Sequence, residues 1–250
     1  MRKTLSSFAL LALLGGPVAI ASAQPAARSA PTAAELKRNF ATIEAGTEGE
    51  SDDFDKLTTT TARRLVTYLK AHEVSAAGAK NLGVELSAES ADAAHLKVFT
   101  YSLSSGGTRG TIHKPVLQWR NAAGQFFAYA AYEECEFTKI YQLASPGRTQ
   151  YLLLGQDKGS GSCELSAAYV IELKGNYLLT NRAAFDKNAR LAEAISNSDS
   201  LILCNVDLTF DARGQVLRIT PATPGEEGGE EPATKKAVLK WQGTRFVSGR

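Results

Sequence analysis

Several residue types that identify common protein classes are scarce in this sequence of 250 residues. It contains 3 histidines, 3 cysteines, 2 tryptophans and 1 methionine. A zinc site would need closely spaced Cys and His pairs, and the sequence has none. It also lacks the Walker pattern and the glycine fingerprint of dinucleotide-binding proteins. The sequence therefore gives no sign of a zinc protein or a nucleotide enzyme, and we expect no cofactor and no metal.

An excess of charge of one sign is also missing. The full chain has 28 basic and 26 acidic residues, and two of the basic ones, Arg2 and Lys3, lie in a segment that we expect to be removed. The mature chain then carries 26 residues of each sign. Proteins that bind nucleic acid or anionic lipid usually present a basic face or stripe. We therefore expect no nucleic-acid partner.

The longest apolar run lies at the N-terminus. Residues 8–20 are mostly apolar, follow the basic pair and precede Ala21-Ser22-Ala23, which fits a signal-peptidase site. This pattern predicts a signal peptide over residues 1–23, with a retained N-terminal anchor as the alternative. The run is too short and too interrupted for a permanent membrane span. We expect a periplasmic or secreted protein with no membrane span after cleavage.

Two helices are predicted before a β-rich region. Residues 24–31 are rich in Ala, Pro and Ser and predict a disordered linker. Thr32 begins a capping-box pattern and Ser51 precedes an acidic first turn, so a helix is predicted after each. We expect a helical segment over residues 32–94 to pack on an antiparallel β domain over residues 95–250.

Short apolar runs separated by turn residues dominate the rest of the chain. Asn121-Ala122-Ala123-Gly124-Gln125 and Asp211-Ala212-Arg213-Gly214-Gln215 share one signature. The Asn or Asp side chain can bond forward to the backbone, and the Gly accepts a positive φ. Runs joined by such turns pair antiparallel. The fold class predicted is mainly β (α+β), an antiparallel meander or barrel-like sheet of about ten strands with two N-terminal helices.

Three cysteines in an exported chain allow at most one intrachain disulfide. The turn Ser145-Pro146-Gly147-Arg148 folds one predicted strand back on the next, which brings Cys135 near the loop that holds Cys163. We therefore predict a disulfide between Cys135 and Cys163. Cys204 alternates with apolar residues in a strand predicted over residues 201–210, so it is expected to be a buried thiol.

Acidic residues provide the catalytic candidates. Glu133, Glu134 and Glu136 are candidates for the paired carboxylates of a glycosidase, with Asp157 or Glu164 as the partner. The competing interpretation is a solvated acidic run, because neighbouring residues of a strand point to opposite faces. We favour this second interpretation and assign no catalytic residue.

Histidine gives no further catalytic candidate. No His lies in a local nucleophile motif, and His95 and His113 are expected to be surface or strand-edge residues.

Aromatic side chains are frequent on the predicted hairpins. If one face of the sheet packs against the helices, aromatic residues on the other face form a platform that can stack a sugar ring or a partner's side chain. We name Trp119, Tyr129 and Tyr132 as binding candidates. Burial in the core is the alternative for each of them.

Two short motifs resemble known sequences. The segments Trp241-Gln242-Gly243-Thr244-Arg245-Phe246 and Tyr101-Ser102-Leu103-Ser104-Ser105-Gly106-Gly107-Thr108 resemble patterns in uncharacterised exported β-rich bacterial proteins. The resemblance implies export and a β-rich fold, and it brings no activity with it.

Three functions from different classes fit these observations. The preferred one is a non-catalytic binding or envelope-associated module with an unknown extracytoplasmic ligand or protein partner. The second is a secreted hydrolase of envelope or extracellular polymer. The third is an inhibitor-like protein that uses the hairpin loop over residues 104–110.

Overall fold

The fold is taken from a computed structural model that describes residues 30–131, 133–159, 163–180, 184–185, 200–222 and 236–248. The predicted signal peptide, the predicted linker up to residue 29, and Tyr132 lie outside these ranges.

The described residues form three helices and thirteen strands. The helices are α1 (Ala33–Ala45), α2 (Asp52–Ala71) and α3 (Ala76–Leu82). The strands are β1 (Glu85–Glu89), β2 (Lys97–Ser104), β3 (Thr111–Arg120), β4 (Phe126–Ala130), β5 (Glu136–Leu143), β6 (Thr149–Lys158), β7 (Glu164–Lys174), β8 (Tyr177–Thr180), β9 (Ser200–Cys204), β10 (Val206–Asp211), β11 (Val216–Pro221), β12 (Ala237–Trp241) and β13 (Phe246–Ser248). The prediction of a mainly β fold with N-terminal helices is confirmed.

The strands form three antiparallel sheets, each of which contains a four-stranded meander. The first sheet has the order β1-β2-β3-β4, the second β5-β6-β7-β8 and the third β10-β11-β12-β13. Strand β9 joins the second sheet by pairing with the first half of β7, while β8 pairs with the second half. Over the part of the chain that is described, the sheets stay open. The meander is therefore confirmed and the barrel-like closure is not formed.

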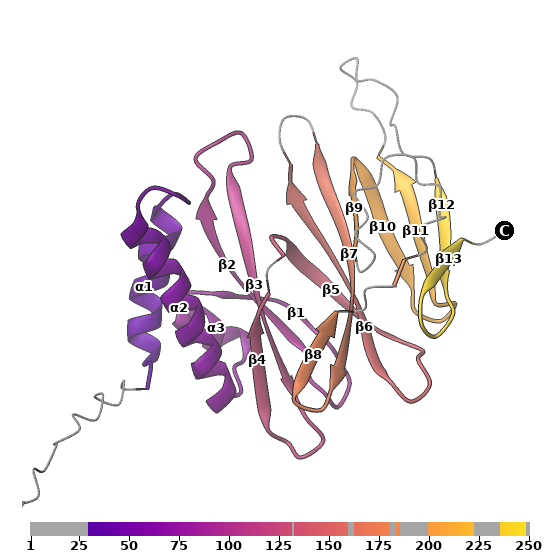
Figure 1. The fold of residues 1–250 in the computed structure, drawn as a ribbon, viewed down its shortest axis with the longest axis horizontal. Coiled ribbons are helices and arrows are strands. Elements are labelled where there is room, and N and C mark those ends of the chain that lie inside the picture. The colour runs from indigo at the N-terminus through magenta and orange to yellow at the C-terminus, as the bar shows by residue number, and fades with distance from the viewer. Residues whose placement is uncertain are drawn as a thin grey trace, which may run out of the picture.

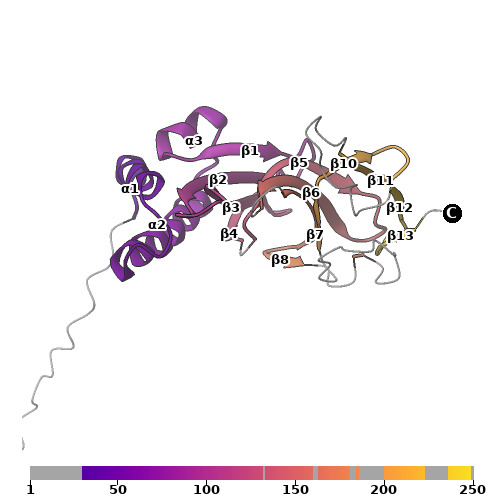
Figure 2. The same cartoon turned by 90° about the horizontal axis from the view of Figure 1, so that it is seen from above.

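The helices and sheets follow one another along the long axis of the molecule (Figure 1). The three helices lie at one end beside the first sheet, and the third sheet lies at the opposite end. The view from above again places the helices to one side of the strands (Figure 2). Three hydrophobic clusters fill the junctions between the helices and the first sheet, the first and second sheets, and the second and third sheets.

Alternate residues of one strand enter different hydrophobic clusters. On β3, Val116 packs toward the helices, whereas Leu117 and Trp119 pack between the first and second sheets. On β6, Leu152 packs toward the third sheet and Leu153 toward the first. A strand that is buried on both faces has an unbroken apolar sequence instead of an alternating one. The central strands β3 and β6 are thus buried on both faces, whereas Tyr129 on β4 and Tyr177 on β8 are exposed.

The predicted helix starts are confirmed at both positions. Thr32 Oγ1 accepts a hydrogen bond from the Glu35 N–H at 3.2 Å, and Ser51 Oγ accepts one from Phe54 at 3.2 Å. The Glu35 carboxylate accepts a hydrogen bond from Arg64 Nη2 at 2.7 Å. This bond links α1 to α2.

The connection before β2 holds more structure than the sequence indicated. It contains α3 and also β1, which pairs with β2. The first sheet therefore begins at Glu85, inside the range predicted as the helical segment.

The two turn signatures share their side-chain hydrogen bonds but differ in the residue that takes a positive φ. Asn121 Oδ1 accepts two backbone hydrogen bonds, and Gly124 has a φ of +78°, as predicted. Asp211 Oδ1 also accepts two backbone bonds, but there Gln215 takes the positive φ, at 54°. Gly214 has a different role, since a Cβ at that position would lie 2.7 Å from the Asp211 carboxylate.

Candidate functional site

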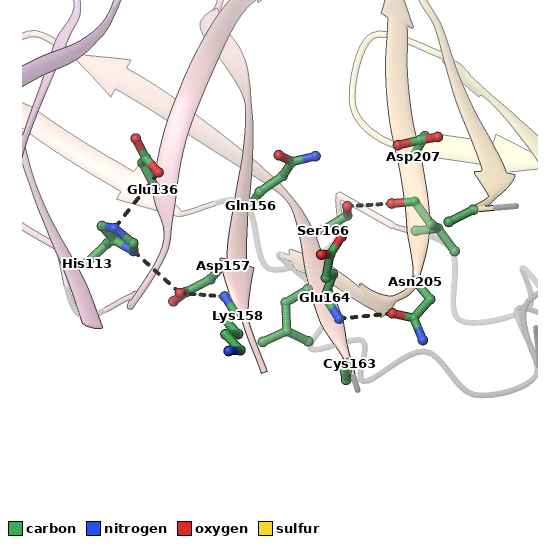
Figure 3. Close-up of a pocket in the computed structure, with 13 residues that line it drawn as sticks. His113, Glu136, Gln156, Asp157, Lys158, Cys163, Glu164, Ser166, Asn205 and Asp207 are labelled. Atoms are coloured by element: carbon green, nitrogen blue, oxygen red, sulfur yellow. Dashed lines mark hydrogen bonds and ion pairs between the residues drawn. The ribbon is translucent and has the colours of Figure 1, made fainter. Parts of the chain in front are cut away.

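A cleft of about 510 Å³ lies where the second sheet meets the third. His113, Glu136 and Asp157 lie on one side of it, and Glu164, Asn205 and Asp207 lie on the other (Figure 3). These residues come from β3, β5 and β6 on the first side, and from β7, β10 and the corner between β9 and β10 on the second. The cleft therefore depends on how three successive meanders meet.

Asn205 forms the corner at which the chain leaves the second sheet for the third. Its φ of 52° is left-handed, a conformation that Asn tolerates better than most residues. The Glu164 N–H donates to Asn205 Oδ1 at 2.9 Å, and the Asn205 N–H donates to the Glu164 carbonyl at 2.8 Å. The Asn205 carbonyl accepts a hydrogen bond at 2.9 Å from the N–H of Ala222, the residue that follows β11 of the third sheet. This corner replaces the single strand predicted over residues 201–210.

The disulfide joins Cys163 to Cys204, with Cα atoms 5.2 Å apart. The prediction of a bridge between Cys135 and Cys163 is therefore wrong. The reason is the pairing of β7 with β9, which places Leu165 opposite Cys204 and brings Cys163 beside it. The sequence did not reveal that a strand following a long connection would return to this edge. The disulfide lies at the rim of the cleft, because Cys163 is one of its lining residues.

The buried thiol is Cys135, not Cys204 as expected. Cys135 is free and 3% exposed, and its Sγ donates to the Gln156 carbonyl at 3.7 Å. A Cβ on Gly155 would lie 2.6 Å from this Sγ, so β6 approaches the thiol closely. Burial raises the pKa of Cys135 far above its ordinary value, which keeps the thiol protonated and unreactive.

Arg109 connects two carboxylates beside the cleft. Its Nη2 lies 2.6 Å from Asp157 Oδ2, and its Nη1 lies 2.6 Å from Glu134 Oε2. The Asp157 side chain is 2% exposed and also accepts the backbone N–H of Lys158 at 2.8 Å. Arg109 lies in the loop between β2 and β3, Glu134 precedes β5, and Asp157 lies on β6. The guanidinium therefore links the first sheet to the second.

The ion pairs continue on both sides of Arg109. Lys114 pairs with Glu134 and, at 3.1 Å, with Glu48 in the turn between α1 and α2. On the cleft side, His113 Nδ1 lies 3.4 Å from Asp157, and its Nε2 lies 3.9 Å from Glu136 (Figure 3). We call the resulting chain of seven residues the charged network; it runs in the order Glu48, Lys114, Glu134, Arg109, Asp157, His113, Glu136.

The charged network favours the ionised form of its members. Burial alone would raise the pKa of Asp157, but the hydrogen bonds from His113, Arg109 and the Lys158 backbone outweigh it and lower that pKa. The pKa of Glu134 falls in the same way, because Lys114 and Arg109 outweigh the effect of burial. The hydrogen bond to Asp157 raises the pKa of His113 against the opposing effect of burial. Asp157 is therefore fixed as a carboxylate, and protonated His113 is favoured.

The cleft is predominantly acidic. Its charged lining side chains are Glu136, Asp157, Glu164, Asp207, Lys158 and His113. Even with His113 protonated, the carboxylates outnumber the cations by two. Hydrogen-bonding groups accompany them on Gln156 and Asn205. Such a surface attracts a cationic group and orients it through polar contacts.

The three glutamates proposed from the sequence have separate positions. Glu136 lines the cleft together with Asp157 and Glu164, so the structure brings the suggested partners into one site. Glu134 lies behind the cleft, where Arg109 and Lys114 hold it. Glu133 is half-buried and makes no ion pair within the described residues.

Of the two aromatic binding candidates that the structure describes, Trp119 is buried and Tyr129 is exposed. Trp119 is 3% exposed, stacks with Phe127 and donates its indole N–H to the Gly175 carbonyl at 3.2 Å. Tyr129 on β4 is 37% exposed. Tyr132 lies outside the described residues. The cleft itself is lined by no Phe, Trp or Tyr among the residues described.

Sequence reasoning missed the cations that organise the site. Arg109 lies in a glycine-rich loop, His113 is predicted to lie at the surface or a strand edge, and no motif includes Lys114. Their partners lie 20 to 66 residues away, so no local motif marks them. The feature of the sequence that could have indicated this site is a single Arg in a loop otherwise made of Ser, Thr and Gly.

Comparisons with known proteins do not assign the site. No family model matches the chain, no curated protein is significantly similar in sequence, and no solved structure is significantly similar in fold. None of the described helices is both long and apolar enough to cross a membrane. Within the described ranges, no group of three or more His, Cys, Asp or Glu side chains is placed to hold a metal ion.

Proposed function

We propose that this chain is an exported, non-catalytic binding protein, periplasmic or secreted, whose acidic cleft holds a positively charged group of an extracytoplasmic ligand or protein partner. The observation that carries the proposal is the excess of carboxylates in a cleft whose central acid, Asp157, is fixed as an ion by Arg109 and His113. A disulfide at the rim agrees with an oxidising compartment.

The rigidity of the cleft supports a binding role. Asn205 fixes the corner between the second and third sheets with three backbone-directed hydrogen bonds, and Ser166 Oγ donates to the Val206 carbonyl across the same junction. The disulfide holds β7 and β9 together next to this corner. A preformed site loses little conformational entropy when a ligand binds, which favours affinity.

The hydrolase alternative has weaker support. A glycosidase needs one carboxyl group with a raised pKa to protonate the leaving oxygen. The carboxyl groups with a clear shift, Asp157 and Glu134, shift downward. Among the described residues, the lining of the cleft also includes no aromatic side chain of the kind that commonly stacks a sugar ring.

The inhibitor alternative needs a projecting loop over residues 104–110, but this loop is attached to its surroundings. Ser104 exchanges backbone hydrogen bonds with Gly46 and Glu48 at 3.1 and 2.9 Å, and Ser105 bonds Gly110 at 2.8 Å. Arg109 of this loop is committed to the charged network. The base of the loop and Arg109 are thus bonded to neighbouring segments, while residues 106–108 and 110 are exposed.

A titration tests the proposal. The probes are spermidine and a Lys/Arg-containing hexapeptide, with a hexapeptide of matched length containing Glu as the control, followed by amide chemical shifts and calorimetry. We expect saturable binding of the cationic probes that weakens with added salt and shifts the amides of residues 164, 205 and 207. The double variant Glu164→Gln/Asp207→Asn should weaken binding by about tenfold, while Asp53→Asn on the exposed start of α2 should not. Equal binding by the double variant and the wild type would contradict the proposal.

Export is tested separately. Intact mass and N-terminal sequencing of the chain expressed with its own N-terminus should give a mature protein that begins at Gln24 and is found outside the cytoplasm. A cytoplasmic protein that retains Met1 would disprove this part of the proposal.

A further inference from the structure

His113 lies between two carboxylates on one side of the cleft (Figure 3). Its Nδ1 is 3.4 Å from Asp157 Oδ1 on β6, and its Nε2 is 3.9 Å from Glu136 Oε2 on β5. The His113 side chain is 23% exposed, so the ring can exchange protons with water. A protonated imidazole donates from both nitrogens, whereas the neutral ring donates from one. Only protonated His113 can therefore act as a donor to both carboxylates.

The two carboxylates differ in their other contacts. Asp157 Oδ2 accepts a hydrogen bond from Arg109 Nη2 at 2.6 Å, and Asp157 Oδ1 also accepts the Lys158 N–H at 2.8 Å. The Asp157 side chain is 2% exposed, which leaves it little access to a ligand. Glu136 is 39% exposed, and among the described residues its ion pair is with His113. Glu136 is therefore the accessible carboxylate whose charge His113 offsets.

The groups around His113 favour its protonated form in the empty cleft. The hydrogen bond to Asp157 raises the pKa of His113, and it outweighs the opposing effects of burial and of the positive charge of Arg109. The charge of Glu136 adds to the rise. On β2, the residue opposite His113 is the uncharged Ser102. The shorter contact holds the Nδ1 proton against Asp157, so Nε2, which faces Glu136, is the nitrogen that loses its proton first.

The protonation of His113 also changes the net charge of the cleft. The lining contains four carboxylates, and Lys158 is its other cation. With His113 protonated, the carboxylates outnumber the cations by two; with His113 neutral, they outnumber them by three. The added negative charge appears beside Glu136, at the surface that a ligand reaches. A cation is attracted more strongly to the second state than to the first.

We propose that His113 regulates the cleft: when protonated it competes with a cationic ligand for Glu136, and the ligand binds more tightly once His113 has released its Nε2 proton to water. This inference rests on the proposed binding function, since it needs a cation in the cleft. Protonation and ligand binding then weaken each other by the same factor. The protein therefore holds its ligand at neutral and alkaline pH and releases it in acid.

The test uses the full chain and an Arg-containing hexapeptide with an acetylated N-terminus and an amidated C-terminus. The charge of this peptide is constant between pH 5.5 and 8.5, and carboxyl groups ordinarily titrate near pH 4, below this range. Calorimetry should show about tenfold tighter binding at pH 8.5 than at pH 5.5. His113→Gln should bind with nearly the same affinity at both pH values. His72→Gln, at the exposed end of α2, is the matched control and should keep the tenfold difference.

A second measurement needs no variant. Because the linkage is reciprocal, a tenfold difference in affinity corresponds to a change of about 1 in the pKa of His113. Saturating peptide should therefore lower the pKa of His113 by about 1, followed through the chemical shift of its ring proton across the pH range. Glu136→Gln should weaken binding about tenfold at pH 8.5 and change it little at pH 5.5, where His113 already offsets this carboxylate.

The outcomes separate this inference from the function on which it rests. Absence of saturable binding at every pH would overturn both. Saturable binding with equal affinity at pH 5.5 and 8.5 would support the binding function and overturn the role of His113. A pH dependence that persists in His113→Gln would do the same. Unchanged affinity of Glu136→Gln at pH 8.5 would show that the ligand and His113 do not compete for this carboxylate.

Discussion

Arg109 Nη2 lies 2.6 Å from Asp157 Oδ2, although the two residues are 48 positions apart in the sequence. This contact joins the loop between β2 and β3 to the end of β6 and so connects the first sheet with the second. The same guanidinium also pairs with Glu134, so two acids share one cation. Arg109 thus offsets part of the negative charge beside the acidic cleft.

The first prediction concerns this contact. Asp157→Asn leaves Arg109 without one of its two carboxylates in a partly buried position, and we expect a loss of about 3 kcal/mol in the free energy of unfolding. Asp207→Asn is the matched control, because Asp207 lines the same cleft and makes no ion pair among the described residues; it should change stability by less than about 0.5 kcal/mol. Urea unfolding at pH 7 measures both variants, and equal losses would disprove the assigned role of Arg109.

The second prediction is a pH dependence of stability. The raised pKa of His113 means that its stabilising effect is complete below its unfolded value of about 6.5 and is lost as the pH rises through the folded value. His113→Gln should therefore cost about 1 kcal/mol at pH 5.5 and almost nothing at pH 9. Thermal unfolding of the variant and the wild type across this range measures the difference. A cost independent of pH would show that His113 contributes packing alone.

A fall in pH should also weaken the charged network, because it protonates the carboxylates. The pKa values of Asp157 and Glu134 are lowered on folding, so their stabilisation is present above the unfolded values near 4 and is lost as the pH falls through the folded ones. The charged network should thus contribute most between roughly pH 4 and 6.5. Asp157→Asn should lose its destabilising effect once the pH falls below the lowered pKa of Asp157, and the acid unfolding curves of the two proteins should converge there.

The third prediction separates the two possible cystine pairings. Peptide mapping without reduction should recover Cys163 linked to Cys204, and Cys135 should react with a thiol reagent only after denaturation. The bridge spans a sequence separation of 41, so Cys163→Ser/Cys204→Ser should lower the free energy of unfolding by up to about 4 kcal/mol. Recovery of Cys135 in a disulfide-linked peptide would contradict the structure.

The fourth prediction concerns the corner at Asn205. Asn205→Ala places a residue with a poor tolerance for positive φ at 52° and leaves the Glu164 N–H without its acceptor, so we expect a loss of about 2 kcal/mol. Asn205→Gly keeps the backbone conformation and loses only the side-chain bond, so it should cost about 1 kcal/mol. Chemical unfolding compares them, and an alanine variant as stable as the glycine variant would rule out backbone strain at this position.

The local elements were predictable because their causes lie within a few residues. Thr32 and Ser51 cap helices through hydrogen bonds to backbone groups three positions on, and Asn121 organises a turn through bonds two and four positions on. Such signals work in any tertiary context, since both partners are neighbours in the chain. The same reasoning missed β1, whose short polar sequence becomes a strand only because β2 offers it an edge.

The sequence by itself determined that the chain forms N-terminal helices followed by antiparallel hairpins, because capping and turn chemistry are local. Only the tertiary structure decided which cysteines pair, that both faces of β3 and β6 are buried, and that Arg109, His113 and Asp157 meet beside one cleft. These features depend on contacts between residues tens of positions apart. The packing order of whole sheets sets such contacts, and no pattern of neighbouring residues encodes that order.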